Sequence, residues 1–436
     1  MRSSKGWLEQ MRFMGRGKWE WNSRVALVGI TIISISTLLT VVACGSNEPE
    51  VVDTPTPGPI VEPTATPEPE PTVEPTMAPT EEPTKAPAAA RSEPVELFQK
   101  DVRNIDAWIN SEPTSIAELT SQGKVVLVDF WTYTCVNCLR TLPFLRDWHD
   151  KYSDNGLVIL GVHAPEFDFE KELENVERSV EEEGIEWPVA LDNEMSTWRS
   201  FNNRYWPAKY LVGIDGEIHY SHFGEGAYRE TELEVRRVLT DAGYDVSAIP
   251  VGEIENTERD ETARSVTREL YGGYDRNYSV YGLYAAQDEY YVQPDREVEY
   301  EDRYAEFDSY PPQKFALHGL WRNEREAIVH ARETDDLSDY IAFRFHGRSA
   351  NVVIDPPEPD EFKVYVELGG QPLAENEAGD DILYDDEGRS YFNVDEGRMY
   401  KIVETPEYVE NTLKLSSDSV NFAIFAFTFG IYEGGF

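Results

Sequence analysis

The sequence is poor in cysteine and in basic residues. Only three of its 436 residues are cysteine, too few for the dense disulfide framework of small secreted domains. Lysine and arginine number 39 against 82 aspartates and glutamates, which gives a formal net charge of −43. This charge repels phosphate backbones, so it argues against nucleic acid as a partner and indicates a solvated acidic surface. A hydrophobic content of 40% is enough for more than one core, and the length predicts two or three domains.

Residues 1–44 have the pattern of a targeting segment. Val25 to Ala43 form a run of 19 residues without a charge, preceded by six basic and two acidic residues, which is a charge bias that keeps the N-terminus inside. The run ends in Val-Val-Ala-Cys44, which resembles the lipobox of bacterial lipoproteins, so lipidation is expected at Cys44. An uncleaved single-span helix is the alternative, because 19 apolar residues approach the thickness of a bilayer. Either anchor predicts an extracytoplasmic protein at the outer face of the bacterial cytoplasmic membrane.

Residues 45–94 lack the side chains that a core requires. Positions 46–94 hold 13 of the 27 prolines, interleaved with threonine and glutamate, and contain no aromatic residue. Such a composition predicts a disordered linker. We expect it to hold the folded part near the membrane but away from its surface.

Residues 95–245 alternate apolar runs of strand length with segments of helical periodicity. The predicted order is strand, helix, strand, helix, hairpin and helix, which is typical of an α/β domain with a mixed sheet flanked by helices. The turn of the hairpin is expected at Asp215-Gly216. The elements are expected at 124–131, 139–152, 156–163, 173–184, 208–223 and 231–243, and the last helix is expected to open with Thr231 and Glu234 in capping-box spacing.

Two of the three cysteines follow the first predicted strand directly and open the next helix. A helix N-terminus stabilises a thiolate, so Cys135 is the predicted nucleophile. Cys138 lies one turn later, where it can attack a mixed disulfide on Cys135 and release the reduced substrate. A structural bridge is one alternative, although closing so short a loop stabilises little. A zinc half-site is another, but it needs two further ligands, such as His219 and His222. We therefore predict a redox-active disulfide with no metal and no other cofactor.

Three further features resemble the thioredoxin fold. Asp129 lies six residues before Cys135, Pro143 lies five after Cys138, and Trp206-Pro207 precedes a predicted strand. They match the buried acid, the helix-kinking proline and the cis-proline of that fold. The long spacing to Pro207 resembles the TlpA/ResA-type thiol–disulfide oxidoreductases. The segments "WTYTCVNCLRTLPFL" and "NNRYWPAKYLVGIDGEIHYSHFGEG" are similar in sequence to the extracytoplasmic portion of DipZ-like proteins.

The resemblance implies a role for each of these residues. Asp129 is expected to have a raised pKa and to take the proton that Cys138 loses. Pro207 joins the catalytic residues because its cis bond presents backbone groups to a substrate chain. Trp206, Trp131 and Thr134 are the expected substrate-binding residues, with Trp131 packing near the site.

Two departures from the family pattern bear on these roles. The pair between the cysteines is Val136-Asn137 instead of Gly-Pro, and Thr134 precedes the first cysteine. Both leave the reduction potential open within a span from about −270 to −120 mV. His163 is interpreted as a strand-end residue rather than a catalyst.

Residues 265–436, after a connector at 246–264, have the pattern of an antiparallel β domain. Strand-like runs such as "FKVYVEL", "SYFNV" and "NFAIFAFTF" are separated by turns. Phe425, Phe427 and Phe429 alternate and are therefore expected on one buried face. The pattern predicts an all-β jelly-roll-like sandwich. It resembles the carbohydrate-binding-module-like domain of DipZ-like proteins, which makes glycan a candidate ligand. Trp321, Tyr271 and Tyr274 are aromatic residues that could stack on a sugar, but we interpret them as ordinary packing residues.

Together these features predict a membrane-tethered thiol–disulfide oxidoreductase that reduces disulfides of client proteins. DipZ-like proteins carry their own electron-delivering membrane domain, so we expect a separate CcdA-type membrane electron donor as a partner here. A thiol peroxidase is one alternative, because Thr132-x-x-Cys135 resembles the end of the peroxiredoxin signature. Val128 stands where that signature has proline. A glycan-binding surface lipoprotein with a structural disulfide is the other alternative.

Overall fold

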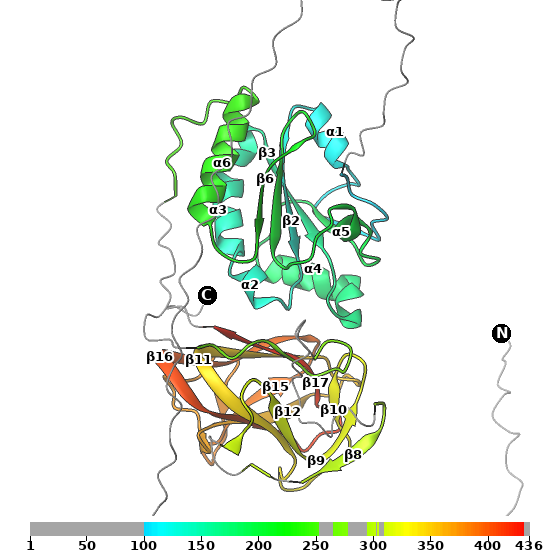
Figure 1. Ribbon diagram of the computed structural model, residues 1–436, viewed down its shortest axis with the longest axis vertical. Coiled ribbons are helices and arrows are strands. Elements are labelled where there is room, and N and C mark those ends of the chain that lie inside the picture. The colour runs from blue at the N-terminus through cyan, green and yellow to red at the C-terminus, as the bar shows by residue number, and fades with distance from the viewer. Residues whose placement is uncertain (1–99, 253–264, 278–293, 302, 305–308, 431–436) are drawn as a thin grey trace, which may run out of the picture. The chain divides into compact units, whose positions relative to one another are not determined.

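Two β-sheets organise the part of the chain that the structure describes (Figure 1). The computed structural model describes residues 100–252, 265–277, 294–301, 303–304 and 309–430. The targeting segment with Cys44, the linker and most of the connector lie outside these residues, so their predictions stay predictions. Within the described ranges, no helix has the length and apolar character needed to cross a bilayer. All the described residues belong to one compact unit of the chain.

The first sheet has six strands in the order β1-β4-β3-β2-β5-β6. Strands β2, β3 and β4 run parallel, and β1, β5 and β6 pair antiparallel, so the sheet is mixed as predicted. Every residue of β2 is buried, because helices cover both faces of the sheet. The strands are β1 (Trp108–Ile109), β2 (Val125–Trp131), β3 (Leu157–His163), β4 (Val189–Leu191), β5 (Ala208–Val212) and β6 (Ile218–Phe223).

The helices form one layer on each side of this sheet (Figure 1). Alternate residues of β2 serve the two layers, because successive side chains of a strand point to opposite faces. Leu127 belongs to the core with α3 and α6, whereas Val128 belongs to the core with α1 and α5. The helices are α1 (Ile116–Ser121), α2 (Val136–Leu139), α3 (Leu142–Tyr152), α4 (Leu173–Glu182), α5 (Ser196–Ser200) and α6 (Tyr228–Asp241), with 3-10 turns η1 (Ser153–Asn155) and η2 (Asp168–Lys171).

The sequence located most of these elements, with two local errors. The predicted start of the last helix at Thr231 is wrong: α6 begins at Tyr228, and the Thr231 hydroxyl donates 2.9 Å to the carbonyl of Ala227. A threonine and a glutamate three residues apart also occur inside helices, so the spacing alone is ambiguous. The helix after the cysteines is interrupted between α2 and α3, and Pro143 lies in the first turn of α3, where its missing N–H costs no helical hydrogen bond. The short elements β1, α1, β4 and α5 were not predicted.

Among the described residues, the second sheet joins eleven strands, which is consistent with the predicted β-sandwich. Its path is β14-β15-β12-β16-β11-β17-β10-β9-β8, with β13 on β12 and β7 on β17. The long strand β11 pairs with β9 at one end and with β17 at the other. The bounds are β7 (Leu270–Tyr271), β8 (Glu297–Tyr300), β9 (Phe315–Asn323), β10 (Ile328–His330), β11 (Tyr340–Ile354), β12 (Phe362–Leu368), β13 (Gln371–Pro372), β14 (Leu383–Tyr384), β15 (Ser390–Val394), β16 (Arg398–Ser416) and β17 (Ala423–Gly430).

The alternation predicted for β17 is broken at Phe425. Ala426 pairs with Val353 and Ile424 pairs with Ile354, so Phe425 is an extra residue that no residue of β11 opposes. A β-bulge of this kind redirects a side chain. Phe427 packs in the sandwich core, whereas Phe425 joins the core of the first sheet. The prediction that all three phenylalanines share one face is therefore wrong for Phe425.

One hydrophobic core runs from the first sheet into the sandwich. Phe425 lies edge-on to Phe167 and Phe169, with ring centroids 5.2 and 5.0 Å apart. Val353 and Met399 of the sandwich belong to the same cluster. The packing between the two sheets is therefore part of the folded core.

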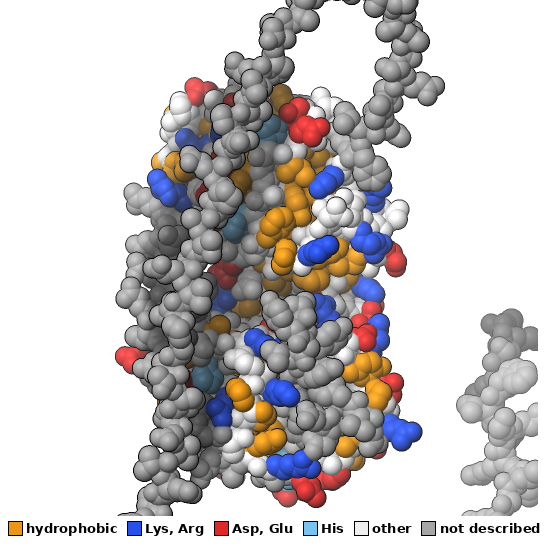
Figure 2. Space-filling model, viewed as in Figure 1, with side chains coloured by type: hydrophobic (Ala, Val, Ile, Leu, Met, Phe, Trp, Pro, Cys, Tyr) orange, Lys and Arg blue, Asp and Glu red, His pale blue; other side chains and the backbone are white. Residues whose placement is uncertain are grey.

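On the surface shown in Figure 2, basic, acidic and hydrophobic side chains are interspersed.

Candidate functional site

Cys135 and Cys138 are joined by a disulfide at the start of α2. Their Cα atoms are 5.2 Å apart, and the backbone N–H of Cys138 donates to Sγ of Cys135 at 3.2 Å. Cys135 is half-buried, whereas Cys138 is only 1% exposed. A donor aimed at the sulfur favours its thiolate form after reduction. The geometry thus exposes one sulfur for attack from solvent and keeps the other for the internal step.

Asp129 lies on the face of the first sheet that packs against the cysteine helix. It has the same parity in β2 as Leu127 and Trp131, whose core also contains Cys138. Asp129 is 2% exposed, and its Oδ1 has no hydrogen-bond partner among the described residues. Burial raises its pKa from 3.8 to about 6, and the charge of Lys209 partly opposes this shift. Such a carboxyl changes protonation close to physiological pH, which suits proton transfer.

Lys209 is the partner of Asp129 that sequence reasoning missed. The two residues are opposite each other in the β2–β5 pairing, and Nζ of Lys209 lies 3.9 Å from Oδ1 of Asp129. Both side chains are buried, and burial lowers the pKa of Lys209 while the Asp129 charge opposes it. The available signal was a lysine inside an apolar strand, "AKYLV". Only the strand register shows which carboxylate it faces.

The loop between β2 and the cysteines is held by His163 from the end of β3. The Oγ1 of Thr132 lies 3.3 Å from Nε2 of His163, and the ring of Tyr133 stacks on the imidazole. Trp131 lies edge-on to the same ring at 5.4 Å. Complete burial lowers the pKa of His163 from 6.5 to about 3, so the ring is neutral at pH 7. His163 therefore supports the loop, in line with its interpretation as a strand-end residue.

A second buried carboxyl, Glu170, holds the residue before the nucleophile. Its Oε1 accepts a hydrogen bond from the Thr134 hydroxyl, and its Oε2 accepts from the backbone N–H groups of Glu166 and Phe167. Glu170 is fully buried, and burial together with the Glu166 charge raises its pKa from 4.5 to about 7. Sequence reasoning missed this residue because it lies 35 positions after Cys135, beyond the loop that follows β3.

The predicted substrate-binding residues divide into an accessible and a buried set. The Trp206–Pro207 peptide bond is cis, and the half-buried Trp206 donates from Nε1 to the Ala164 carbonyl at 2.9 Å. Trp131 and Thr134 are only 1% and 2% exposed. We therefore assign these two residues to support of the loop, and Trp206 remains the candidate for substrate contact.

A second ion pair continues from Lys209 toward the sandwich. The charge of Glu225 favours the charged form of Lys209 and so opposes the lowering of its pKa by burial. Glu225 also lies 3.6 Å from Nη1 of Arg140. Arg140 follows the cysteines, is 3% exposed and donates to Ser349 of β11 at 3.5 Å. Gly430 faces the same guanidinium, and a Cβ there would lie 2.3 Å from its Nη2. The absence of a side chain at this position allows the sandwich to approach the end of α2.

The sandwich also contributes one wall of the cavity beside Cys135. This cavity measures about 250 Å³ and contains Cys135 in its lining. Its lining residues are Cys135, Val136, Asn137, Glu166 and Trp206 from the first domain, and Val266, Thr267, Arg268, Glu269, Tyr271, Thr428 and Phe429 from the sandwich.

A network around Glu166 fixes this wall. Glu166 forms an ion pair with Arg276 and accepts a hydrogen bond from the Tyr271 hydroxyl at 2.8 Å. Arg276 also donates to the backbone carbonyl of Glu166 at 3.1 Å. We name these three residues the Glu166 latch.

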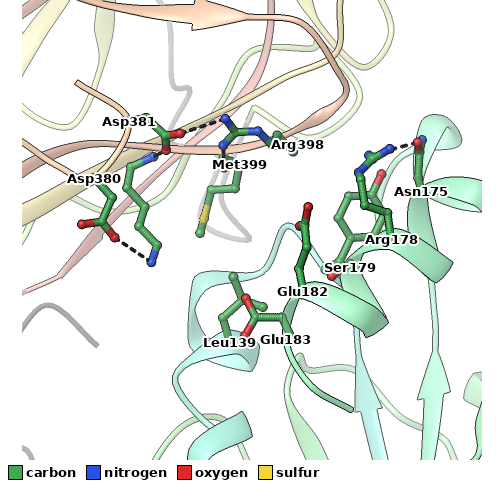
Figure 3. A pocket seen from close by; sticks show the side chains of 12 residues that line it. Leu139, Asn175, Arg178, Ser179, Glu182, Glu183, Asp380, Asp381, Arg398 and Met399 are labelled. Carbon is green, nitrogen blue, oxygen red and sulfur yellow. Dashed lines mark hydrogen bonds and ion pairs between the residues drawn. The ribbon is translucent and has the colours of Figure 1, made fainter. Parts of the chain in front are cut away.

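A further cavity, of about 240 Å³, lies between α4 and the sandwich (Figure 3). Asp381 and Arg398 pair at 2.8 Å on the sandwich side, and Glu182 and Arg178 extend from α4. Arg178 reaches Glu396 at 3.0 Å. Neither cysteine lines this cavity, so we interpret it as a polar part of the junction.

The remaining predicted residues do not form a site in the structure. Trp321 is fully buried and donates to the His318 carbonyl, in line with its interpretation as a packing residue. Tyr271 is engaged in the Glu166 latch, and Tyr274 donates to Asp295. His219 pairs with Asp215 at 3.0 Å. Among the described residues, no group of three or more His, Cys, Asp or Glu is arranged to hold a metal ion.

Comparison with known proteins supports the assignment of both parts. Residues 101–221 match the AhpC/TSA family, and residues 267–430 match the thioredoxin-like C-terminal domain family. Protein DipZ of Mycobacterium bovis is 36% identical over 262 residues, which is 58% of this chain but 34% of DipZ. The chain thus spans about a third of that relative's length.

Two smaller proteins align with about a third of the chain. Thiol–disulfide oxidoreductase YkuV of Bacillus subtilis is 28% identical over 31% of this chain and 89% of its own. The crystal structure of a thiol–disulfide isomerase from Corynebacterium glutamicum covers 31% of this chain and 93% of its own, with 24% identity and a TM-score of 0.29. The chain therefore combines a thioredoxin-like domain of the AhpC/TSA type with a thioredoxin-like C-terminal domain, and it is homologous to DipZ and YkuV.

Proposed function

We propose that this protein is a thiol–disulfide oxidoreductase in which the Cys135–Cys138 couple exchanges electrons with disulfides of client proteins. The observation that carries the proposal is the asymmetry of the pair, with the half-buried Cys135 and the buried Cys138 at the start of α2. A purely structural bridge across three residues stabilises the fold little. The similarity to YkuV, which is named a thiol–disulfide oxidoreductase, supports the same activity.

The proposed reaction begins with the reduced pair. The Cys135 thiolate attacks one sulfur of the client disulfide, which forms a mixed disulfide and releases one client thiolate. Cys138 then transfers its proton toward Asp129 and attacks Sγ of Cys135, which releases the second client thiol. The two electrons reach the client, and the protein is left with the Cys135–Cys138 disulfide. A donor dithiol regenerates the reduced pair by the same exchange in reverse.

We further propose that this reaction takes place at the outer face of the bacterial cytoplasmic membrane. The charge bias before Val25 and the lipobox-like end at Cys44 support an anchor there. We propose a CcdA-type membrane protein as the source of electrons.

The test uses the full chain without the third cysteine. In a Cys44→Ser background, Cys138→Ser is expected to trap a mixed disulfide between Cys135 and client proteins. The clients come from an extract that has been reduced and reoxidised, and the trapped product is seen as a dithiothreitol-sensitive band. Cys135→Ser in the same background is the matched control and is expected to trap none. Equal trapping by both variants, or by neither, would contradict the proposal.

The match to the AhpC/TSA family favours thiol peroxidase activity as a second candidate. In that reaction the Cys135 thiolate takes one peroxide oxygen to form a sulfenic acid, and Cys138 condenses with it to give the disulfide and water. Consumption of hydrogen peroxide by the reduced protein, measured against the Cys135→Ser variant, tests it. The expected rate is far below the rate of disulfide exchange.

A further inference from the structure

The sandwich lies where a thioredoxin-like site would otherwise be open to its substrate. Sandwich residues Val266 to Glu269, Tyr271, Thr428 and Phe429 line the same cavity as Cys135 and Trp206. A substrate must therefore reach the exposed sulfur through a space that has walls on two sides.

Buried contacts hold this second wall in place. Glu166 is 8% exposed at its side chain and is bound by Arg276 and Tyr271. The Phe425 bulge packs on Phe167 and Phe169, in the segment that carries Glu166. These contacts make the wall part of one continuous core, so it does not act as a loosely attached module.

The size of the cavity limits what can enter. Its volume of about 250 Å³ is below the range typical of small-molecule pockets, about 300 to 1,000 Å³. It therefore admits one or two side chains of a polypeptide at a time. A disulfide set into the flat surface of a globular domain would bring the rest of that surface against the sandwich residues that line this cavity.

The chemistry of the lining indicates selection by shape. Arg268 and Glu269 are adjacent residues whose charged forms have opposite signs, burial raises the pKa of Glu269 to about 7, and Glu166 is paired with Arg276. Trp206, Phe429 and Val266 offer apolar surface around them. Such a lining contacts a peptide without a strong preference for its net charge.

We propose that the sandwich is a steric filter of the redox site, and that the site takes cysteines in extended or locally unfolded polypeptide segments. This inference rests on the proposed function and specifies its substrate class. Extended segments pass between two walls and bond through their main chain, which is the usual way in which such grooves bind peptides.

The test varies the mouth of the cavity without touching the cysteines. Val266 lines the cavity and is 36% exposed, so Val266→Trp narrows the entrance at little cost to the core. Val420 is 40% exposed on the sandwich and is not among the lining residues, which makes Val420→Trp the matched control. Both variants are made in the full chain with Cys44→Ser.

Three probes are compared by stopped-flow measurement of the thionitrobenzoate that each probe releases when the reduced protein attacks it. The first is a linear peptide with one cysteine as its thionitrobenzoate mixed disulfide, the second is a folded domain with the same group on a surface helix, and the third is the free bis-thionitrobenzoate disulfide. Attack by Cys135 releases thionitrobenzoate because it is the better leaving group, and Cys138 then frees the peptide thiol.

We expect the linear peptide to react at least about tenfold faster than the folded domain, which is about 1.4 kcal/mol in the barrier. Val266→Trp is expected to slow the peptide about tenfold and the free reagent less than about twofold, whereas Val420→Trp changes neither. Equal rates for peptide and folded domain, no effect of Val266→Trp on the peptide, or an equal loss for the free reagent would overturn the filter. Failure of every probe to react with the unmodified site would instead contradict the proposed function.

Discussion

The buried Asp129 gives the sharpest prediction, because its protonation state affects both the activity and the stability of the protein. Its pKa lies near 6 instead of 3.8, mainly through burial. If Asp129 accepts the proton of Cys138, the rate of the internal step rises with pH through about 6. Asp129→Asn is expected to abolish this inflection and to slow the step about 100-fold, the lower end of general-base effects.

The same shift sets the effect on stability. The unfolded chain releases this proton near pH 4, whereas the folded protein keeps it to about pH 6, so the free energy of unfolding falls as the pH rises through this window. The difference between 3.8 and about 6 corresponds to about 3 kcal/mol. Asp129→Asn is expected to remove this part of the pH dependence, and denaturant titrations at pH 4 and pH 7 measure it.

Lys209 offers an internal control for this reasoning. Lys209→Met removes the cation that favours the ionised carboxylate, so the kinetic inflection is expected to move to higher pH instead of disappearing. The assay is single-turnover release of a client thiol from the mixed disulfide, with alkylation of Cys135 checking that the first cysteine is unchanged. An inflection near pH 6 that persists in Asp129→Asn would refute the role of Asp129.

Three further predictions concern the contacts around the site. Glu170→Gln removes a charge next to Thr134 that is half formed near pH 7, and the pKa of the Cys135 thiol is expected to fall by about one, measured by the pH dependence of its alkylation. Arg276→Met leaves a buried carboxylate without its cation and is expected to cost about 3 kcal/mol in unfolding free energy, whereas an Arg276→Lys variant is expected to cost less. Phe425→Ala is expected to cost about 3 kcal/mol and to separate the unfolding of the two sheets into two transitions in calorimetry; a single unshifted transition would contradict its place in the shared core.

The helices and strands that could be predicted from the sequence are those whose own residues show a hydrophobic pattern. The buried strands β2 and β3 appear as apolar runs, and the helix α4 appears as three apolar residues at helical spacing before Gly184. The start of α6 was misplaced because Thr231 satisfies a capping pattern without capping the helix. Phe425 was misplaced because its bulge depends on the register with β11, which no local pattern encodes.

The candidate site likewise contains residues that the sequence predicts and residues that only the tertiary structure brings together. The cysteine pair and its position at a helix start are readable from the sequence pattern, and the choice of Asp129 follows from the resemblance to the thioredoxin fold. Lys209 meets Asp129 through strand register, and Glu170 meets Thr134 through the path of the loop after β3. The second wall of the cavity comes from residues more than 130 positions after Cys135. Such contacts are set by tertiary packing, so a single sequence does not reveal them.

The reduction potential of the Cys135–Cys138 couple tests the central claim most directly. The full chain with Cys44→Ser is equilibrated in glutathione buffers of graded ratio, and the fraction of alkylated thiol is measured by mass. We expect a two-electron transition with a potential between about −270 and −120 mV. A pair that stays fully oxidised throughout this range would be a structural bridge and would contradict the account.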